Sequence, residues 1–558
     1  MSTPLGNAAW SVRIIDRCVR QGIRHFFVAP GSRCTPLTMA IAQHPHVNVT
    51  QHFDERALAF ACLGYGKASH VPGVFICTSG TAVANALPAV VEASQEEVPM
   101  LLLTADRPPE LRGTGANQTI DQVHIFGNYV RQFFDIPCPQ DASFESLDTM
   151  LSAAMSAATD GPVHLNCMFR EPFETGDQAI SQAMHPKSDW VDCLASPTNV
   201  TNHVSNSRID LTDISSDLLI CLGTCDASEA DAAIQLADQL AAPLFADVTS
   251  GVRCGATDLT LCSHQLPKPD SILHLGGRIV SKRWWQFVQQ AQPRQYVQVS
   301  RLRQPIDPCH TVTRFHRSRI TAETFNLPSS MLTNQLREPW QAELGRIRQA
   351  VQDELARLSS ADTEMHEPYI AHEMAGTIPD GDALFLGNSM PVRDMDLFGV
   401  WHAQKRVSVA ANRGASGIDG VLATAVGFAL GSQRRTSLIL GDLSLLYDLN
   451  SLALLARSPV PIVVVVINND GGGIFHFLPI AEETQHFERF FGTPHGCRFQ
   501  AGCEMFGVPY ARATSNRMFA ATYRRALASE QSCVIEVQTN RIENRKLHAR
   551  LTNIAKAI

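Results

Sequence analysis

The sequence predicts an α/β protein made of three doubly wound domains, each with a parallel sheet. First, short runs rich in valine, isoleucine and leucine alternate with longer segments of helical composition, as in strand–helix–strand units. Second, the alternation falls into three blocks, which are separated by polar stretches at 178–208 and 327–362. Third, several strand-like runs end in polar and glycine residues, as expected where the strands of an open sheet meet a ligand. We therefore expect domains at residues 1–180, 181–362 and 363–558.

The first domain is expected to alternate strands and helices from its beginning. Helices are predicted from about 54 to 68 and from 81 to 93, where alanine is frequent. The predicted strands are 23–29, 47–51, 74–77 and 99–104.

The second and third domains repeat this pattern. In the second domain, strands are predicted at 218–223, 243–247, 272–276 and 296–299, and 327–362 is expected to form one or two polar helices. In the third domain, strands are predicted at 383–386, 407–410, 437–440, 462–467 and 533–537.

Composition excludes several classes of function. The 558 residues are 45% hydrophobic and 18% charged, and the net charge of −8 argues against a nucleic-acid-binding surface. The longest apolar run, 459–467, is too short to cross a bilayer, and no signal peptide is recognised. The 15 cysteines are odd in number and include no Cys-x-x-Cys pair. We expect reduced thiols, a cytoplasmic location, no membrane insertion and no nucleic-acid partner.

Two polar positions follow neighbouring strands of the third domain. Asp442 comes directly after the strand at 437–440 and Asn469 after the strand at 462–467, so one strand–helix–strand unit places both at the same sheet edge. A carboxylate, an amide oxygen and the carbonyl of Gly471 are hard oxygen donors that suit Mg²⁺, with Mn²⁺ as the alternative metal. Two ordinary turns would give the same residue types, and this alternative stays open.

The spacing of these residues resembles the diphosphate-binding motif of thiamine diphosphate enzymes. That motif is Gly-Asp-Gly followed, after a similar interval, by Asn-Asn; here Gly441-Asp442 lies 26 residues upstream of Asn468-Asn469. The resemblance implies that Asp442 and Asn469 bind the metal through side chains and Gly471 through its carbonyl. Leu443 and Ser444, which depart from the common motif, would lie beside the diphosphate. The three-domain layout is also that of these enzymes.

The same resemblance assigns the remaining cofactor contacts. It implies that Glu55 hydrogen-bonds the aminopyrimidine ring and promotes the tautomer that activates the cofactor. Asp54 and Glu55 could instead simply favour a helix N-terminus as acids. The residues implied to touch the cofactor elsewhere are Thr78, Ser79 and Gly80 at the pyrimidine, Ser389 at a phosphate, and Ser416 and Ile418 beneath the ring system. Ile418 would impose the bent cofactor conformation, although a core isoleucine is the alternative.

Seven motifs in order resemble a narrower family, the 2-succinyl-5-enolpyruvyl-6-hydroxy-3-cyclohexene-1-carboxylate synthases, often called MenD. They are 29–33, 53–56, 78–82, 104–109, 115–120, 412–420 and 441–444. In this family Leu443-Ser444 is the usual form of the metal motif. The resemblance implies decarboxylation of 2-oxoglutarate and 1,4-addition of the succinyl carbanion to isochorismate, in menaquinone biosynthesis.

The substrates implied by the resemblance each carry two carboxylates, and arginines occupy the motif loops. Arginine binds carboxylates with two parallel hydrogen bonds and stays charged when partly buried. Substrate contacts are expected from the cations Arg33, Arg107, Arg393, Arg413, Lys282 and Arg283, from the polar residues Ser32, Asn117 and Gln118, and from an apolar wall of Ile474, Phe475 and Leu478. For each cation a salt bridge is the alternative, and for the wall an ordinary helix core.

The family resemblance also implies an assembly. Cofactor sites of thiamine diphosphate enzymes lie between the pyrimidine domain of one subunit and the diphosphate domain of another, so a homodimer is the smallest active unit and a tetramer is compatible. Two other functions stay open: a thiamine diphosphate-dependent decarboxylase or carboligase for a simpler 2-oxo acid, and a non-catalytic nucleotide- or phosphate-binding protein of the same fold.

Overall fold

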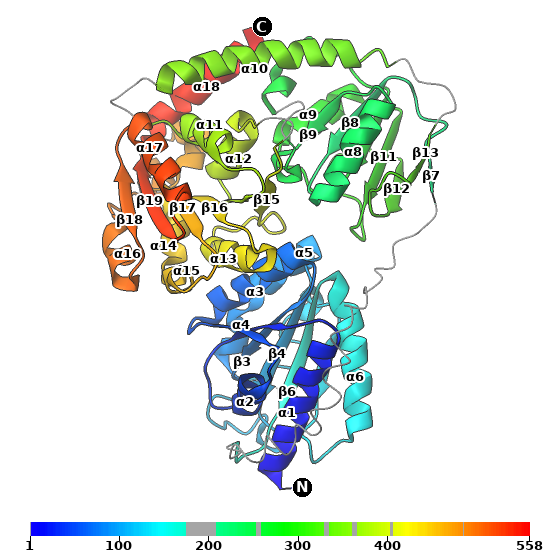
Figure 1. Ribbon diagram of the computed structural model, residues 1–558, viewed down its shortest axis with the longest axis vertical. Coiled ribbons are helices and arrows are strands. Elements are labelled where there is room, and N and C mark those ends of the chain that lie inside the picture. Colours follow the sequence, from blue (N-terminus) through cyan, green and yellow to red (C-terminus); the bar gives the residue numbers. More distant parts are fainter. Residues whose placement is uncertain are drawn as a thin grey trace. The chain divides into compact units, whose positions relative to one another are not determined.

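The computed structural model describes residues 2–173, 208–252, 258–327, 334–359, 365–401, 405–483 and 485–557. The chain forms two compact units (Figure 1). The first unit contains the described residues of 1–202, 414–433 and 447–460; the second contains those of 203–413, 434–446 and 461–558. The predicted domain boundaries after 180 and after 362 fall outside the described residues and stay predictions.

The first unit is built on a parallel sheet of six strands in the order β2-β1-β3-β4-β6-β5. The strands are β1 (His25–Val28), β2 (Asn48–Gln51), β3 (Gly73–Cys77), β4 (Met100–Asp106), β5 (Phe133–Ile136) and β6 (Pro162–Met168). The helices are α1 (Thr3–Arg20), α2 (Thr35–Gln43), α3 (Glu55–Ser69), α4 (Thr81–Asn85), α5 (Leu87–Glu96), α6 (Phe144–Ala157), α13 (Val421–Ser432) and α15 (Leu452–Ala456). The four predicted strands are confirmed, and β5 and β6 are additional.

Side chains of this sheet alternate between two apolar layers, as strand geometry requires. Phe26 and Val28 of β1 belong to the core that also contains apolar residues of α1, α2 and α6. Phe27, between them, is equally buried but does not belong to that core. Helices therefore cover both faces of the sheet, which is the doubly wound arrangement that the sequence predicts.

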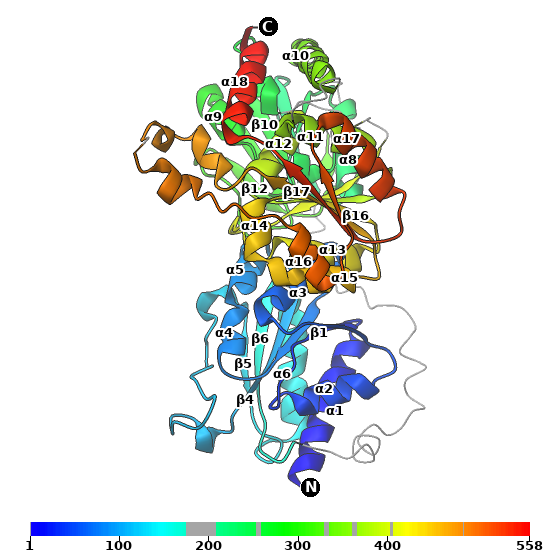
Figure 2. The same ribbon diagram turned by 90° about the vertical axis from the view of Figure 1, so that its left-hand side faces the viewer.

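Helix α3 packs along α13 (Figure 1 and Figure 2). Glycines permit the close approach: a Cβ at Gly64 would collide with the carbonyl oxygen of Thr424, and a Cβ at Gly427 with that of Ala61. This packing fixes the start of α3, where Glu55 lies, relative to the loop that precedes α13.

The second unit contains two larger parallel sheets and one small strand pair. One sheet has the order β12-β11-β10-β8-β9 and the other β15-β14-β16-β17-β19-β18. The strands are β7 (Ile209–Asp210), β8 (Leu218–Leu222), β9 (Leu244–Ala246), β10 (Ser271–Leu275), β11 (Gln295–Ser300), β12 (Arg314–Arg317), β13 (Phe325–Asn326), β14 (Ala383–Leu386), β15 (Ser408–Ala411), β16 (Thr436–Gly441), β17 (Ile462–Asn468), β18 (Tyr510–Ala513) and β19 (Cys533–Gln538). All nine strands predicted for this part of the chain are present.

Helices surround both sheets of the second unit (Figure 1). They are α8 (Ala227–Gln239), α9 (Lys282–Ala291), α10 (Arg337–Ser359), α11 (Glu367–Thr377), α12 (Met390–Phe398), α14 (Asp442–Tyr447), α16 (Gln500–Phe506), α17 (Asn516–Leu527) and α18 (Arg541–Ala557). The predicted polar helix in 327–362 is α10. Among the helices that the structure describes, none is both long and apolar enough to cross a membrane.

Strand order identifies the functional edge of each six-stranded sheet. In the first unit β1 lies between β2 and β3, and in the second unit β14 lies between β15 and β16. The connections after the first and third strands of each sheet therefore run in opposite directions along the sheet. Ligands of such sheets bind at this reversal, at the carboxyl ends of the strands. The loops that carry the predicted site residues leave these ends.

Candidate active site

The pair Asp442 and Gly471 joins the two loops that follow β16 and β17. The strands are in parallel register, with Gly441 opposite Ile467, so the loops begin side by side. Oδ2 of Asp442 accepts the N–H of Gly471 at 3.0 Å, and Oδ1 accepts the N–H of Leu443 at 2.6 Å. The predicted meeting of these two loops is confirmed.

The carboxylate of Asp442 is buried, with 2% of the residue exposed. Burial raises the pKa of Asp442, while hydrogen bonds from Gly471 and His495 lower it in part. Nδ1 of His495 accepts the N–H of Cys497 at 2.9 Å, so the neutral ring carries its proton on Nε2, which lies 3.2 Å from Oδ2 of Asp442. These contacts fix the carboxylate in one orientation.

The side-chain amide of Asn469 is held from one end only. Its Nδ2 donates to Oε1 of Glu367 at 3.1 Å. Its Oδ1 is buried and accepts no hydrogen bond from the described residues. A buried oxygen without a partner is costly, so this atom is suited to a ligand such as a cation.

Gly471 cannot be replaced by a larger residue without a shift of the backbone. Its φ is +129°, and a Cβ there would collide with the carbonyl oxygen of Gly492. Asp442 thus offers a carboxylate, Asn469 an amide oxygen without a partner among the described residues, and Gly471 its main-chain carbonyl. These hard oxygen donors fit a hard divalent cation. Phosphate and water oxygens would complete its coordination.

A second polar group of the same unit follows β14. Asn388 donates through Nδ2 to the Asn412 carbonyl at 2.8 Å and accepts Nη1 of Arg413 at 2.8 Å. Arg393, on α12, donates to the carbonyl of Ser389. Burial and the charge of Arg413 both lower the pKa of Arg393. The two predicted arginines therefore lie close together beside Ser389.

The other predicted residues of this unit differ in how far they are exposed to solvent. Ser444 is buried and Leu443 is half-buried in the first turn of α14. Ile474 and Phe475 are half-buried, and Leu478 is 46% exposed, which is unlike a helix core. Lys282 is exposed at the start of α9, and Arg283 pairs with Asp258, so the salt-bridge alternative is realised at Arg283.

In the first unit, Glu55 is the first residue of α3 and is half-buried. The helix is capped by its neighbour: Oδ1 of Asp54 accepts the N–H of Arg56 at 2.8 Å and that of Ala57 at 3.3 Å. Asp54 therefore serves as the N-cap, and Glu55 is not needed for that purpose. Burial, with the charges of Cys34 and Glu55, raises the pKa of Cys77, so Glu55 lies near the end of β3.

The loop 78–80 at the end of β3 gathers three predicted residues. Ser79 is fully buried, its hydroxyl contacts Nη1 of Arg107, and its carbonyl accepts Nε2 of Gln118 at 2.9 Å. Thr78 is buried beside it. The N–H of Gly80 donates to Oε1 of Gln122 at 2.9 Å. Loops after β3 and β4 are thus locked to one another.

Arg33 lies close to Arg107 in this unit. Burial and the charge of Arg107 both lower the pKa of Arg33. Arg33 donates to the Phe169 carbonyl at 2.9 Å and to Oε1 of the exposed Glu171 at 3.0 Å, so the salt-bridge alternative is realised at Arg33 as well. Ser32 and Asn117, also predicted as substrate contacts, are exposed.

The loop 414–420 is held by a buried acid. Oε1 of Glu92 accepts the N–H of Gly414 at 2.8 Å and Oε2 accepts that of Ala415 at 2.6 Å. Glu92 is 2% exposed, and burial raises its pKa. Ile418 is 39% exposed, so it is not the core isoleucine of the alternative interpretation. Ser416, half-buried, lies in the same loop.

Three family models match this chain. They are the N-terminal TPP binding domain of thiamine pyrophosphate enzymes over residues 11–125, the middle domain of thiamine pyrophosphate over 184–386, and the C-terminal TPP binding domain of thiamine pyrophosphate enzymes over 395–537.

Similar whole proteins are 2-succinyl-5-enolpyruvyl-6-hydroxy-3-cyclohexene-1-carboxylate synthases. That of Rubrobacter xylanophilus is 41% identical, with 98% of each chain covered. Those of Salinibacter ruber and Chlorobium limicola are 40% and 39% identical and cover 99% and 98% of this chain and 97% of their own. The chain belongs to this family of synthases.

Several polar residues at the candidate synthase site are absent from the sequence prediction. Glu92, Gln122 and Glu367 each hold a predicted residue or its loop from a distant part of the chain. His495 contacts the Asp442 carboxylate. Asn166 accepts Nε2 of Gln122 at 2.8 Å within the sheet. These five residues belong to common polar types and stand in no distinctive local motif, so the sequence alone does not single them out.

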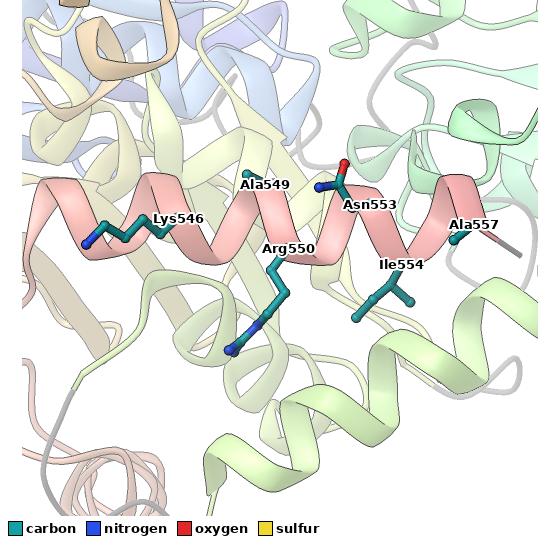
Figure 3. A pocket seen from close by; sticks show the side chains of 6 residues that line it. All are labelled: Lys546, Ala549, Arg550, Asn553, Ile554 and Ala557. Carbon is teal, nitrogen blue, oxygen red and sulfur yellow. The ribbon is translucent and has the colours of Figure 1, made fainter.

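A groove along α18 is unrelated to these residues (Figure 3). It is lined by Lys546, Ala549, Arg550, Asn553, Ile554 and Ala557. Arg550 there pairs with Glu354 of α10 at 2.7 Å. None of the predicted site residues lines this groove.

Proposed function

We propose that the chain decarboxylates 2-oxoglutarate and adds the resulting succinyl group to isochorismate by 1,4-addition, with thiamine diphosphate as cofactor. The product is 2-succinyl-5-enolpyruvyl-6-hydroxy-3-cyclohexene-1-carboxylate, an intermediate of menaquinone biosynthesis. Membership of the synthase family supports this reaction.

The observation that carries the substrate assignment is the pairing of arginines. Arg33 lies near Arg107 in one unit, and Arg393 lies near Arg413 in the other. Like charges destabilise each other, and dianionic ligands would relieve that repulsion while accepting bidentate hydrogen bonds. A pyruvate-type substrate with one carboxylate would need fewer cations. Ser32, Asn117 and Gln118 would add neutral contacts.

We assign the cofactor's metal, Mg²⁺ or Mn²⁺, to Asp442, Asn469 and Gly471. The unpartnered Oδ1 of Asn469 and the fixed carboxylate of Asp442 support this assignment. Ser389, Leu443 and Ser444 would contact the diphosphate, and Thr78, Ser79 and Gly80 the pyrimidine. Ser416 and Ile418 would support the ring system from below. When bound, the cofactor supplies the electron sink for decarboxylation.

Glu55 would hold a proton at the pyrimidine ring nitrogen. Its neighbour Asp54 already caps α3, which leaves the Glu55 carboxylate available for this task. The cationic side chains would orient two dianions that otherwise repel each other, so positioning and charge compensation account for much of the proposed rate. Ile474, Phe475 and Leu478 would exclude water from the reacting atoms.

We further propose a homodimer, or a dimer of such dimers, in which Glu55 of one subunit and Asp442 of the other act on one cofactor. Exposed apolar side chains on the first unit, including Phe53 at 59% and Tyr447 at 56%, support burial in an assembly. The cysteines of the described residues are free, which is consistent with a reducing cytoplasm.

Carbon dioxide release tests the reaction. The purified protein with thiamine diphosphate and Mg²⁺ is assayed with 2-oxoglutarate or pyruvate, each with and without isochorismate. We expect release from 2-oxoglutarate that is sustained only when isochorismate is present. Equal turnover of pyruvate that is independent of isochorismate would instead identify another decarboxylase or carboligase of this superfamily.

A further inference from the structure

Glu367, the first residue of α11, hydrogen-bonds Asn469, one of the proposed metal ligands. Only 2% of the residue is exposed. Its Oε1 accepts two hydrogen bonds, from Nδ2 of Asn469 at 3.1 Å and from Oγ1 of Thr539 at 2.7 Å. Burial, together with nearby Asp394, raises the pKa of Glu367 to about 7. Glu367 is thus a buried acid that touches a proposed metal ligand.

We propose that Glu367 is a positioning residue that orients the Asn469 amide so that its oxygen, and not its NH₂ group, is presented to the divalent cation. The proposal rests on the metal site assigned above. It assigns Glu367 no direct contact with the metal, the cofactor or the substrate.

The two ends of the Asn469 amide differ chemically. A cation binds the carbonyl oxygen, whereas the NH₂ end carries two donors and would repel it. If the Asn469 amide turned over, its oxygen would face Oε1 of Glu367, and two acceptors would then be in contact. The carboxylate therefore selects one of the two amide orientations. The selection holds for neutral Glu367 as well, because a proton on Oε2 leaves Oε1 as the acceptor.

The surrounding structure keeps Oε1 in place. Thr539 donates to Oε1 through its hydroxyl and to the carbonyl of Asn468 through its N–H at 3.1 Å. Asn468 is the last residue of β17 and precedes Asn469 in the chain. Glu367, Thr539 and the end of β17 therefore form one connected hydrogen-bonded group. Among the described residues, two buried oxygens of this group have no hydrogen-bond partner, Oε2 of Glu367 and Oδ1 of Asn469, and the second of these is the proposed metal ligand.

Outer partners of this kind are expected to matter for affinity. Removing a group that orients a metal ligand typically weakens metal binding by about 10- to 100-fold. A role in folding alone would instead lower stability and leave the affinity of the folded protein unchanged.

The test is a titration with Mn²⁺, followed by electron paramagnetic resonance of the free ion, at saturating thiamine diphosphate and without substrate. Three variants are compared with the wild type. Glu367→Leu removes the acceptor; Glu367→Gln keeps an oxygen that can accept from Asn469; and Thr539→Val removes the other hydrogen bond to the same oxygen. Circular dichroism of the metal-free proteins monitors folding.

We expect Glu367→Leu to weaken Mn²⁺ binding by about 10- to 100-fold. Glu367→Gln should stay within about threefold of the wild type, because Asn469 keeps its acceptor. Thr539→Val loosens Oε1 without removing it, so it should weaken Mn²⁺ binding by less than Glu367→Leu does. Unchanged affinity in Glu367→Leu would overturn the proposal, and so would a loss in Thr539→Val as large as that in Glu367→Leu. If the wild type itself binds no Mn²⁺ with the cofactor, the metal site fails and the inference with it.

A second comparison applies even if Glu367→Leu does not fold. In Asn469→Asp two carboxylates face each other, so they either repel each other or share a proton, and in both cases the new carboxylate is a poorer ligand for the cation. Adding Glu367→Gln supplies an N–H for the new carboxylate and should recover Mn²⁺ affinity by about tenfold or more. No recovery in the double variant would contradict the proposed orientation.

Discussion

The N–H of Gly471 donates to Oδ2 of Asp442 at 3.0 Å and so ties the loop after β17 to the loop after β16. The bond holds a carboxylate at the edge where two parallel strands end. We propose that the cofactor's metal binds beside this bond.

Replacement of Asp442 by alanine should reduce binding of the metal and of thiamine diphosphate together, because the metal would link the diphosphate to the protein. We expect a loss greater than the roughly 100-fold typical of an outer-shell partner. Calorimetric titration with cofactor and Mg²⁺ measures this loss of affinity. Unchanged cofactor affinity would contradict the metal assignment.

Glu55→Gln should keep thiamine diphosphate affinity and lower kcat by about 10²- to 10⁴-fold, which is the usual contribution of a positioned acid or base. Asp54 remains as the cap of α3, so the fold should be retained. Steady-state kinetics and a cofactor titration on the same preparation separate the two effects. Near-normal turnover would remove Glu55 from the mechanism.

Arg107→Ala and Arg413→Ala should each lower kcat/KM by about 10- to 100-fold, since each would lose charge-assisted hydrogen bonds to substrate. Cofactor affinity should not change. Arg337→Ala is a matched control, because Arg337 pairs with the exposed Asp238 at 3.0 Å. Wild-type kinetics in both pocket variants would refute the dianion assignment.

Glu92→Gln should loosen the loop that carries Ser416 and Ile418. The carboxylate accepts two main-chain N–H groups, and an amide offers only one acceptor, so a buried donor loses its partner at a cost of about 1–3 kcal/mol. A lower melting temperature and weaker cofactor binding are expected. Glu145→Gln, at an exposed position, should change neither.

Stability should decrease as pH falls below about 6.5. Burial lowers the pKa of His164 to about 3 and that of His274 to about 4. Below the unfolded value the unfolded chain binds protons that the folded chain cannot, so stability rises with pH in this range; each group costs about 1.4 kcal/mol at one unit below that value. Denaturant unfolding between pH 7.5 and 5.5, about the range in which free histidine titrates, measures the trend. A His274→Gln variant should show a smaller pH slope, and an equal slope would contradict the assignment.

The sequence predicts most central strands but only three of the six edge strands of the larger sheets, β2, β9 and β15. Strands such as β17 are continuous apolar runs with both faces covered, and they end in polar turns. The missed strands β5, β12 and β18 are all at sheet edges, where polar residues such as Asp135 and Arg512 interrupt the pattern. In β6, the polar residues His164 and Asn166 interrupt the apolar run. They can be buried there because both hydrogen-bond Thr104 within the sheet.

The same contrast holds for the candidate site. Asp442, Asn469 and the 78–80 loop follow predicted strands directly, so local pattern was sufficient to locate them. Glu367 is 102 residues from Asn469, and Glu92 is 322 residues from Gly414. Such contacts depend on how the sheets and helices pack, which no periodicity in the sequence describes.

Binding of thiamine diphosphate to the purified protein tests the central claim most directly. Isothermal titration is carried out with Mg²⁺ present and again after EDTA has removed divalent ions. We expect saturable binding of thiamine diphosphate with Mg²⁺ that is largely lost with EDTA. Absence of binding in the presence of Mg²⁺ would contradict it.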